Sequence, residues 1–290
     1  MPDQPPARYQ PFRVFADWPR VPIDRRRWDD LAARVTRQRQ SVSAASWASV
    51  SRVALRAATL DAARTAADDP SEPADAATRA SWRQAFASKG LPGVQALYEA
   101  EVRAHELIAA AVAGDAPLTE DLLLRVHEEM IASHEQYPVR RGAEVVLEDV
   151  PAGRYKTYEN FAVLADGGLR AYAPVERVRT EVARLVSEAA DDDFVAAHPV
   201  LQAAYLLYAV DAIHPFADGN GRVARAVASL PLYGQLGLPL VVTPKSRGEY
   251  LASLERTERD DGRRLVEFVF RGGVEAITRA FDALAASSLS

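Results

Sequence analysis

The fold and the site are decided by one stretch of the sequence, His214-Pro215-Phe216-Ala217-Asp218-Gly219-Asn220-Gly221-Arg222-Val223-Ala224-Arg225. An apolar segment at 200–213 precedes it and another at 226–236 follows it, and both are typical of buried helices. Proline disfavours helical backbone at the residue before it, so the first helix is predicted to end at His214. The quoted residues then form a helix end, a tight loop, and the first turn of a second helix starting near Asn220 or Gly221.

The second half of this stretch has the features of an anion site. Gly219 and Gly221 permit positive φ and a close approach of ligand to backbone. A helix N-terminus presents free N–H groups and the positive end of its dipole. Arg222 and Arg225 are three residues apart and share one face of the first turn. Two cations at this end of a helix are unfavourable by roughly 0.3–1 kcal/mol each unless an anion is present. The pattern therefore predicts that an anion binds here.

The first half adds a base and a carboxylate. His214 is a candidate general base at neutral pH. Asp218 offers hard oxygen ligands, and Mg²⁺ commonly takes only one or two carboxylates together with phosphate oxygens. Taken alone, a histidine before proline is typical of a helix cap, Asp-Gly of a turn, and two arginines of a solvated helix face. Their coincidence in one register predicts a phosphate and magnesium site with a base beside it.

At these residues the sequence resembles the Fic family, whose signature is HPFx(D/E)GNGRxxR. The resemblance implies a mainly helical (all-α) fold with a small β-hairpin flap, and transfer of AMP from ATP to a protein hydroxyl. It also implies a role for each residue. His214 deprotonates the target Ser, Thr or Tyr, Phe216 anchors the loop in the core, and Asp218 holds Mg²⁺. The α- and β-phosphates are bound by Gly219, Asn220 and Gly221, and the β- and γ-phosphates by Arg222 and Arg225.

Composition sets the broad class of protein. Of 290 residues, 48% are hydrophobic and 26% charged, as in soluble globular proteins. The 35 Lys and Arg against 40 Asp and Glu give a net charge of −5, which does not favour a general nucleic-acid role. There is no cysteine, so disulfides and thiolate metal sites are excluded. No signal peptide is evident at residues 1–18 and no apolar run has transmembrane length, so a cytoplasmic protein without a membrane partner is expected.

The N-terminal part of the chain is predicted to precede the catalytic domain. Prolines at positions 2, 5, 6, 11, 19 and 22 indicate an extended arm, whose aromatic residues suggest packing on a surface. Helices are expected at about 24–40, capped by Asp24, then at 46–67 and 76–89. Three arginines at 25–27 suggest either a polyanion contact or, because aspartates surround them, an exposed helix face. We expect an arm plus helical region at 1–90 and a Fic catalytic domain at 91–290, which together could form one compact unit.

Further helices are expected at about 94–113, 120–133, 175–189, 247–259, 263–270 and 274–286. Thr119 is the predicted N-cap of the helix at 120–133, and His127 in that helix is interpreted as structural. Tyr250 and Leu254 share one face of the helix at 247–259. By resemblance this region lines the nucleotide base, whereas by spacing alone it is core.

A β-hairpin is predicted before the signature. Its first strand is Phe161-Ala162-Val163-Leu164, a turn follows at 165–168, and the second strand is at 169–172. By resemblance this is a flap that holds the target segment by strand addition, which places a hydroxyl near the base with little dependence on side-chain identity. Without the signature, an ordinary surface hairpin would be preferred.

The family's inhibitory pattern, (S/T)xxxE(G/N), is not found. Its Glu pairs with the second signature arginine, here Arg225, and blocks productive binding of the γ-phosphate. The pair Glu159-Asn160 has Tyr155 four residues earlier, and Glu275 has Arg271. Either the enzyme is unrestrained, or a separate small antitoxin-like protein supplies the Glu, or regulation differs. We expect activity in isolation.

The predicted function is protein adenylylation: AMP passes from ATP, with Mg²⁺, to a hydroxyl of a target protein, and pyrophosphate leaves. One alternative is the same site with another donor, giving UMP or phosphocholine transfer. Transfer of phosphate is disfavoured, because that part of the loop, here Gly221-Arg222, is altered in the relatives that carry it out. Another alternative is a non-catalytic nucleotide-binding partner module, against which an intact His214 counts. The target protein stays open.

Overall fold

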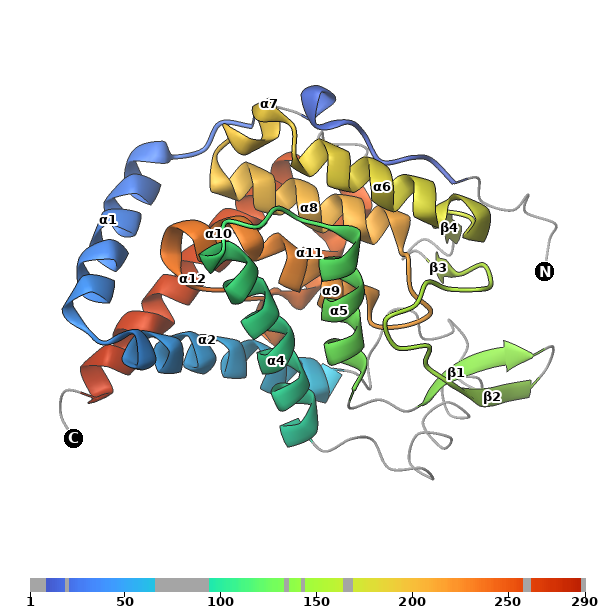
Figure 1. The fold of residues 1–290 in the computed structure, drawn as a ribbon, viewed down its shortest axis with the longest axis horizontal. Coiled ribbons are helices and arrows are strands. Elements are labelled where there is room, and N and C mark those ends of the chain that lie inside the picture. Colours follow the sequence, from blue (N-terminus) through green and yellow to red (C-terminus); the bar gives the residue numbers. More distant parts are fainter. Residues whose placement is uncertain are drawn as a thin grey trace.

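The computed structural model describes residues 9–18, 21–65, 94–132, 136–141, 144–163, 169–257 and 262–287. Helices make up most of this part of the chain, and its strands form two separate two-stranded antiparallel sheets. Figure 1 shows the helices packed around α8, with both hairpins on one side. The predicted mainly helical fold with a small hairpin is confirmed.

In chain order the elements are η1 (Phe15–Asp17), α1 (Arg25–Ser41), α2 (Ala44–Thr65), α4 (Val94–Ala113), α5 (Glu120–Ile131), β1 (Gln136–Arg141), β2 (Glu144–Asp149), β3 (Phe161–Val163), β4 (Leu169–Ala171), η3 (Val175–Arg177), α6 (Val178–Ala189), α7 (Asp192–Val195), α8 (Pro199–Ile213), α9 (Asn220–Ala228), α10 (Leu230–Leu236), α11 (Pro244–Arg256) and α12 (Arg263–Ser287). The helix expected at 76–89 lies outside the described residues. No helix among those described is both long and apolar enough to cross a bilayer.

Helix α8 is the centre of the core. Every residue from Ala203 to Ile213 is buried, and the helix contacts α6, α9, α10 and α12. A helix that is apolar on all sides is stable only when neighbours cover all of them. This burial places the C-terminal end of α8, and with it His214, at a fixed point of the molecule.

The arm packs on α8 over its described residues, 9–18, as expected. Phe12 and Trp18 are buried, and the Trp18 ring stacks on that of Tyr208 with centroids 4.9 Å apart. The Tyr205 hydroxyl donates to the carbonyl of Arg13 at 2.9 Å, and the Arg13 N–H donates to the Tyr208 hydroxyl at 3.1 Å. Two tyrosines of the central helix thus satisfy both backbone groups of one arm residue.

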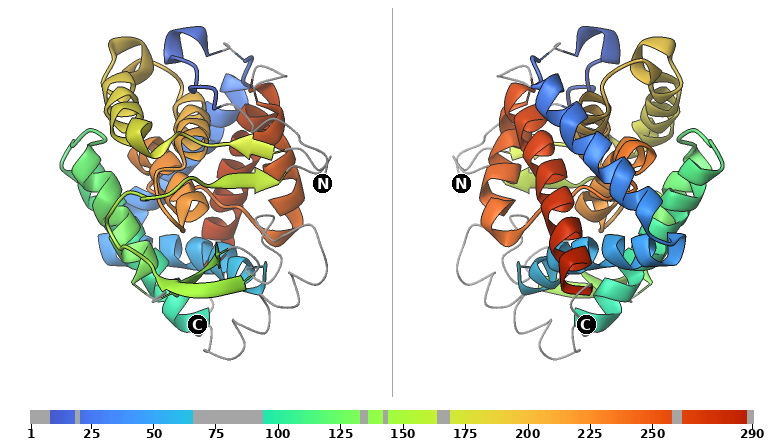
Figure 2. Two further views of the ribbon diagram at one scale, coloured as in Figure 1. Left: turned by 90° about the vertical axis from the view of Figure 1, so that its right-hand side faces the viewer. Right: turned by 90° about the vertical axis from the view of Figure 1, so that its left-hand side faces the viewer.

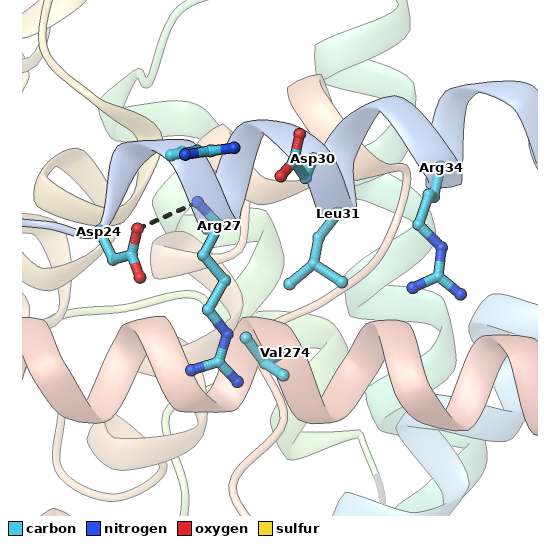
Figure 3. A pocket seen from close by; sticks show the side chains of 7 residues that line it. Asp24, Arg27, Asp30, Leu31, Arg34 and Val274 are labelled. Atoms are coloured by element: carbon cyan, nitrogen blue, oxygen red, sulfur yellow. Dashed lines mark hydrogen bonds between the residues drawn. The ribbon is translucent and has the colours of Figure 1, made fainter.

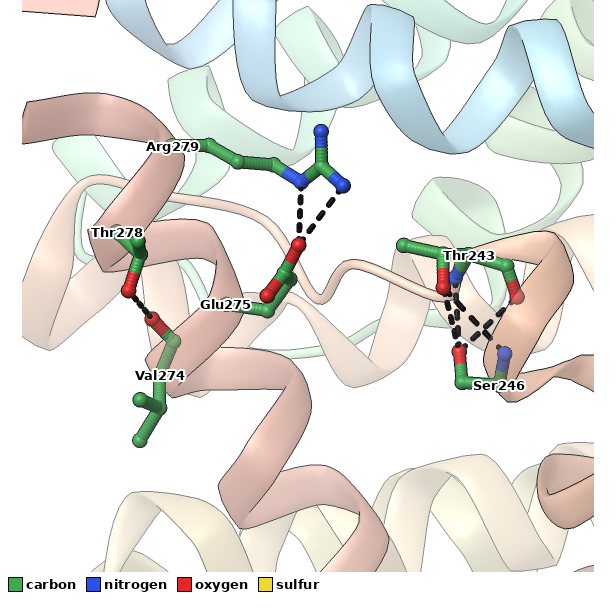
Figure 4. Close-up of polar contacts among 6 residues, drawn as sticks. All are labelled: Thr243, Ser246, Val274, Glu275, Thr278 and Arg279. Carbon is green, nitrogen blue, oxygen red and sulfur yellow. Dashed lines mark hydrogen bonds and ion pairs between the residues drawn. The ribbon is translucent and has the colours of Figure 1, made fainter. Parts of the chain in front are cut away.

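The prediction of two helices at 263–270 and 274–286 is wrong, because α12 runs through Gly272 and Gly273 without a break. A Cβ on Gly272 would lie 2.9 Å from the carbonyl oxygen of Val241, and one on Gly273 would lie 2.6 Å from the Trp28 ring. These glycines therefore allow close packing of neighbouring segments and do not end the helix. Beyond them an ion pair between Glu275 and Arg279 spans one turn of α12 (Figure 4).

Other elements also differ from expectation. The helix expected at 226–236 is divided at Ser229, whose hydroxyl donates to the carbonyl of Arg225 and accepts from the N–H of Leu240. The hairpin formed by β1 and β2 was not predicted from the sequence. Helix α11 begins three residues earlier than predicted because Thr243 and Ser246 form a capping box (Figure 4).

The arginine-rich start of α1 lies beside α12. Asp24 caps α1 by accepting the N–H of Arg27 at 3.0 Å, as predicted. The guanidinium of Arg27 lies over the Phe270 ring and that of Arg34 over the Phe281 ring. A hollow between the two helices is lined by both signs of charge and shares no residue with the signature (Figure 3). This arrangement supports the interpretation as a helix face.

Candidate active site

The backbone of the signature turns sharply at two residues. His214 is the C-cap of α8, with φ 49° and ψ 60°, and Gly219 is the N-cap of α9, with φ 79°. A left-handed conformation is uncommon for a residue with a side chain and carries strain, which is frequent at functional sites. The predicted helix end at His214 and helix start at Asn220 are both confirmed.

The inner side of the loop is closed by Phe216 and Asn220. Phe216 is completely buried, as expected for an anchor. The Asn220 side chain accepts the N–H of Phe216 at 2.9 Å and donates to its carbonyl at 2.8 Å. Because the amide of Asn220 is used in this way, what it offers a ligand is its backbone N–H in the first turn of α9.

Helix α5 holds the loop from one side through His127. The imidazole stacks on the Phe216 ring, with centroids 3.8 Å and planes 1° apart. Its Nε2 lies 3.1 Å from the carbonyl oxygen of Asp218, and its Nδ1 accepts the N–H of Gly153 at 3.0 Å. Burial lowers the pKa of His127 to about 4, so the ring is neutral. His127, interpreted from the sequence as structural, thus supports the signature loop itself.

A second segment holds the loop from the side of the hairpin. The N–H of Lys156 donates to the carbonyl of Pro215 at 2.9 Å, and its buried ammonium donates to Asn160 at 2.6 Å. Asn160 in turn donates to the carbonyl of Phe216 at 3.2 Å. Burial lowers the pKa of Lys156 to about 8, against a smaller opposing effect of Glu159. The residues leading into β3 are therefore built around the loop.

The imidazole of His214 has one protonated and one unprotonated nitrogen. Its Nδ1 lies 3.4 Å from the carbonyl oxygen of Asp211, which can only accept, so Nδ1 carries the proton and Nε2 has a lone pair. Burial, together with the charges of Lys156 and Arg170, lowers the pKa of His214 to about 3. The Tyr172 ring covers the imidazole at 3.7 Å. His214 is thus neutral at physiological pH.

The strand β4 is tied to α8 by an ion pair. Arg170 donates to the carboxylate of Asp211 at 2.8 Å, and the two side chains are 23% and 11% exposed. The Arg170 guanidinium also lies over the Tyr172 ring. At the end of the strand, the N–H of Ala173 donates to the carbonyl of Ile213 at 3.2 Å. These contacts connect the hairpin to the residues around His214.

The charged residues of the signature meet at the start of α9. Arg222 donates to the carbonyl of Met130 at 2.9 Å, and its other terminal nitrogen lies 3.9 Å from the Asp218 carboxylate. The guanidinium of Arg225 hydrogen-bonds the hydroxyl of Tyr250. Among the described residues, no ion pair joins Arg225 to a carboxylate. Two guanidinium groups therefore lie beside the first turn of a helix, an arrangement that suits an anion.

The hairpin is present where predicted, and β3 pairs with β4 in the register Phe161↔Ala171, Ala162↔Arg170 and Val163↔Leu169. Phe161 is 48% exposed, Ala162 is partly exposed, and Leu164 lies outside the described residues. Within the described chain this sheet has only two strands, so neither outer edge pairs with a further strand. Figure 2 shows the strands in front of the helical body.

The candidate base-pocket residues are both buried. Tyr250 packs against Phe268 and its hydroxyl binds Arg225, while Leu254 belongs to the core. Burial raises the pKa of Tyr250 to about 12, against the effect of Arg225. Tyr250 is thus a neighbour of Arg225; a role for Tyr250 and Leu254 at a nucleotide base stays a prediction.

Sequence reasoning missed Lys156, Asn160, Arg170, Tyr172 and Asp211. Asp211 had a signal, because it is the only charge in α8. A carboxylate in an otherwise apolar helix requires a buried partner. Lys156 and Tyr172 had none, since only the tertiary fold brings them to His214.

Comparison with known proteins agrees with this geometry. A model of the Fic/DOC family matches residues 117–232. The protein adenylyltransferase fic-1 of Caenorhabditis briggsae is 30% identical over 188 residues, which are 64% of this chain and 36% of that protein. A Fido domain-containing protein of Dictyostelium discoideum is 44% identical over 62 residues, which are 21% of this chain and 43% of that protein. The chain thus spans well under two thirds of these relatives.

Solved structures show the same fold. A Fic domain containing signaling protein from Bacteroides thetaiotaomicron superposes with a TM-score of 0.60 and 18% identity, covering 89% of this chain and 97% of that one. Residues 134–508 of Fic-1 from Caenorhabditis elegans superpose with a TM-score of 0.58 and 20% identity, covering 89% and 73%. The family model and the sequence relatives place residues 117–232, which contain the intact signature loop, in the Fic/DOC family, and the solved structures share the fold.

Proposed function

We propose that this protein transfers AMP from ATP to a hydroxyl of a target protein and releases pyrophosphate. The observation that carries the proposal is the conformation of one loop. It places a neutral His214 with a free Nε2 at the end of α8, and Arg222 and Arg225 at the start of α9. A base and a polyphosphate site within one rigid turn are what nucleotidyl transfer to a hydroxyl requires.

The residues of the chain would act mainly by positioning. Nε2 of His214 would accept the proton of the target hydroxyl as its oxygen attacks the α-phosphorus. The N–H groups at the start of α9 and the two arginines would hold the phosphates in line and stabilise their charge. The base would contribute roughly 10²–10⁴-fold to the rate, and positioning and charge the rest.

The site fits a magnesium ion bound together with a nucleotide. Asp218 offers one partly exposed carboxylate, with Oδ1 accepting the N–H of Gly219 at 2.6 Å. The described residues contain no cluster of three or more acidic or histidine side chains that would form a full set of protein ligands. A single carboxylate suits Mg²⁺ that takes its other ligands from phosphate and water. When bound, the ion would neutralise phosphate charge.

The hairpin supports a protein target. An extended segment could add to the open edge of β3 or β4, and the contacts of Arg170 and Ala173 with α8 would then set its distance from His214. The sequence relatives named protein adenylyltransferases make a protein hydroxyl the first acceptor to test.

Control of activity is proposed to come from outside the signature. Arg225 is held by the hydroxyl of Tyr250, which carries no charge to compete with a γ-phosphate. This contact supports activity of the isolated protein. An inhibitory partner would have to bring a carboxylate to Arg225.

The test incubates the purified protein and a cell lysate with Mg²⁺ and α-labelled ATP, and reads label and mass on protein. A mass gain of one AMP, lost in His214→Ala, is expected. His198→Ala is the matched control, because it removes a histidine from the other end of α8, where its Nδ1 accepts the N–H of Val200. That variant should lose roughly 1 kcal/mol of stability and keep transfer.

Other donors are tested in parallel with UTP and a choline-bearing nucleotide. A mass gain of UMP or phosphocholine without AMP would replace the proposed donor. Binding of ATP by both the wild type and His214→Ala, with no transfer from any donor to any protein, would favour a non-catalytic module.

A further inference from the structure

We infer that His127 is a positioning residue that orients the Asp218 carboxylate, acting through the peptide bond between Asp218 and Gly219. This inference deepens the proposed function and rests on Asp218 being the residue that faces Mg²⁺ and nucleotide. His127 lies on α5, far from the signature in sequence, and its side chain is completely buried.

The two partners of the imidazole fix its tautomer. The Gly153 N–H can only donate, so Nδ1 of His127 must accept and carries no proton. In the neutral ring the proton is then on Nε2, which faces the carbonyl oxygen of Asp218 at 3.1 Å. That oxygen can only accept, so both hydrogen bonds are satisfied by one tautomer. The other tautomer would place the lone pair of Nε2 against the Asp218 carbonyl and the N–H of Nδ1 against the N–H of Gly153.

The hydrogen bond reaches the carboxylate through a planar unit. In a trans peptide the carbonyl and the following N–H point in opposite directions. His127 draws the carbonyl of Asp218 towards α5, so the N–H of Gly219 points away from α5. That N–H donates to Oδ1 of the Asp218 side chain at 2.6 Å. The orientation of the carboxylate is thus set by a chain of two hydrogen bonds that begins at His127.

The peptide between Asp218 and Gly219 is also restrained by packing. A Cβ on Gly219 would lie 2.8 Å from Cδ1 of Ile131 and 3.5 Å from Cδ2 of His127, so α5 is packed directly on this backbone. Gly219 has φ 79°, and glycine adopts both positive and negative φ, so the peptide before it could rotate if nothing restrained it. The stack of His127 on Phe216 adds a second restraint on the ring. Without the hydrogen bond, the peptide and the carboxylate would sample other orientations.

Substitutions separate hydrogen bonding from packing. His127→Phe keeps a flat ring against Phe216 and removes both hydrogen bonds, whereas His127→Gln keeps an amide that can donate to the Asp218 carbonyl. Val126→Ala is the control, because it removes buried volume from the neighbouring position of α5 without a hydrogen bond to the loop. Thermal melting establishes that each variant is folded and compares the stability lost in Val126→Ala with that lost in the His127 variants.

The main readout is nucleotide binding on a His214→Ala background, measured by calorimetry with ATP in Mg²⁺ and in EDTA. Loss of an outer partner of a metal ligand commonly weakens metal-dependent binding by roughly 10–100-fold. His127→Phe should weaken binding of Mg·ATP about tenfold and leave binding without metal within about twofold, while His127→Gln recovers most of the loss. Equal weakening with and without Mg²⁺, or wild-type affinity in His127→Phe, would overturn the inference.

Two further measurements keep the outcome independent of the proposed reaction. Nitrogen-15 spectra of the folded wild-type protein should show His127 as the Nε2–H tautomer; the Nδ1–H tautomer would contradict the inference even if every variant failed to fold. Binding is measured in a variant without the base, so failure of AMP transfer would affect the proposed function and not this result. In the active protein, His127→Phe should raise the Mg²⁺ concentration for half-maximal rate more than it lowers kcat.

Discussion

The ring of Tyr172 lies 3.7 Å from the imidazole of His214, with the two planes 12° apart. Tyr172 directly follows β4, and the N–H of the next residue, Ala173, donates to the carbonyl of Ile213. The proposed base and the end of the hairpin therefore form one packed unit. A target segment that adds to the hairpin would be placed relative to His214 by these contacts.

This unit predicts a change in the pH dependence of transfer. With the His214 pKa at about 3, the wild-type rate should be flat between about pH 5 and 7.5. Tyr172→Ala admits water to the imidazole, so its pKa should rise towards the ordinary value of about 6.5 and the rate should fall below that pH. Rates measured from pH 5 to 7.5 test this, with Tyr172→Phe as the control that keeps the ring. An acid limb near pH 6.5 in the wild type would contradict the prediction.

Stability is predicted to fall with acidity. Burial lowers the pKa of His105, as of His214, to about 3 in the folded protein, whereas an unfolded histidine titrates near 6.5. Between these values the unfolded state binds more protons, so the free energy of unfolding should decrease as the pH falls from 6.5 towards 3. The limit is about 1.4 kcal/mol per pH unit for each histidine. Denaturant unfolding at pH 7 and 5 measures the slope, which His105→Phe should reduce.

Removing one partner of the ion pair between Arg170 and Asp211 should reduce the stability of the protein more than replacing both partners. Arg170→Met leaves a nearly buried carboxylate without its partner and should cost about 1–3 kcal/mol of stability. Replacing both residues, with Arg170→Met and Asp211→Leu, should recover part of this loss. A double-mutant cycle by chemical denaturation gives the coupling energy. Additive effects of the two substitutions would show that the pair is not coupled.

Gly272 is predicted to be required for packing and not for chain flexibility. In Gly272→Ala the new methyl group meets the Val241 carbonyl at 2.9 Å and Leu240 at 2.8 Å, so stability should fall by about 1–3 kcal/mol.

Gly248→Ala is the matched control, since nothing lies within 4 Å of its added Cβ in helix α11. It should stabilise the protein by roughly 0.5–1 kcal/mol, because alanine has the higher helix propensity. Melting temperatures of the two variants should move in opposite directions. A stabilised Gly272→Ala would mean that α12 can shift away from Val241.

The local geometry of the loop follows from its own residues. Pro215 ends α8 at His214, Gly219 supplies the positive φ before α9, and the charges at 218, 222 and 225 follow from their spacing on one turn. These are short-range effects of covalent geometry and helix periodicity, and they operate within a few residues. The caps at Asp24 and Thr119 were predictable for the same reason. The aromatic residues of the arm predicted that it packs on a surface, but not that this surface is α8.

The residues that surround the loop depend on how distant segments of the chain pack together. The rings of His127 and Tyr172 and the amide of Asn160 contact the signature, and Arg170 pairs with Asp211 just before it, because α5, the hairpin and α8 pack together. The continuity of α12 through two glycines was decided in the same way, since the close contacts with Trp28 and Val241 compensate for the low helix propensity of glycine. Hydrogen bonds and ring contacts between segments remote in sequence leave no periodic signal along the chain. The signature residues could therefore be predicted from the sequence, whereas the residues that hold the signature loop in place could not.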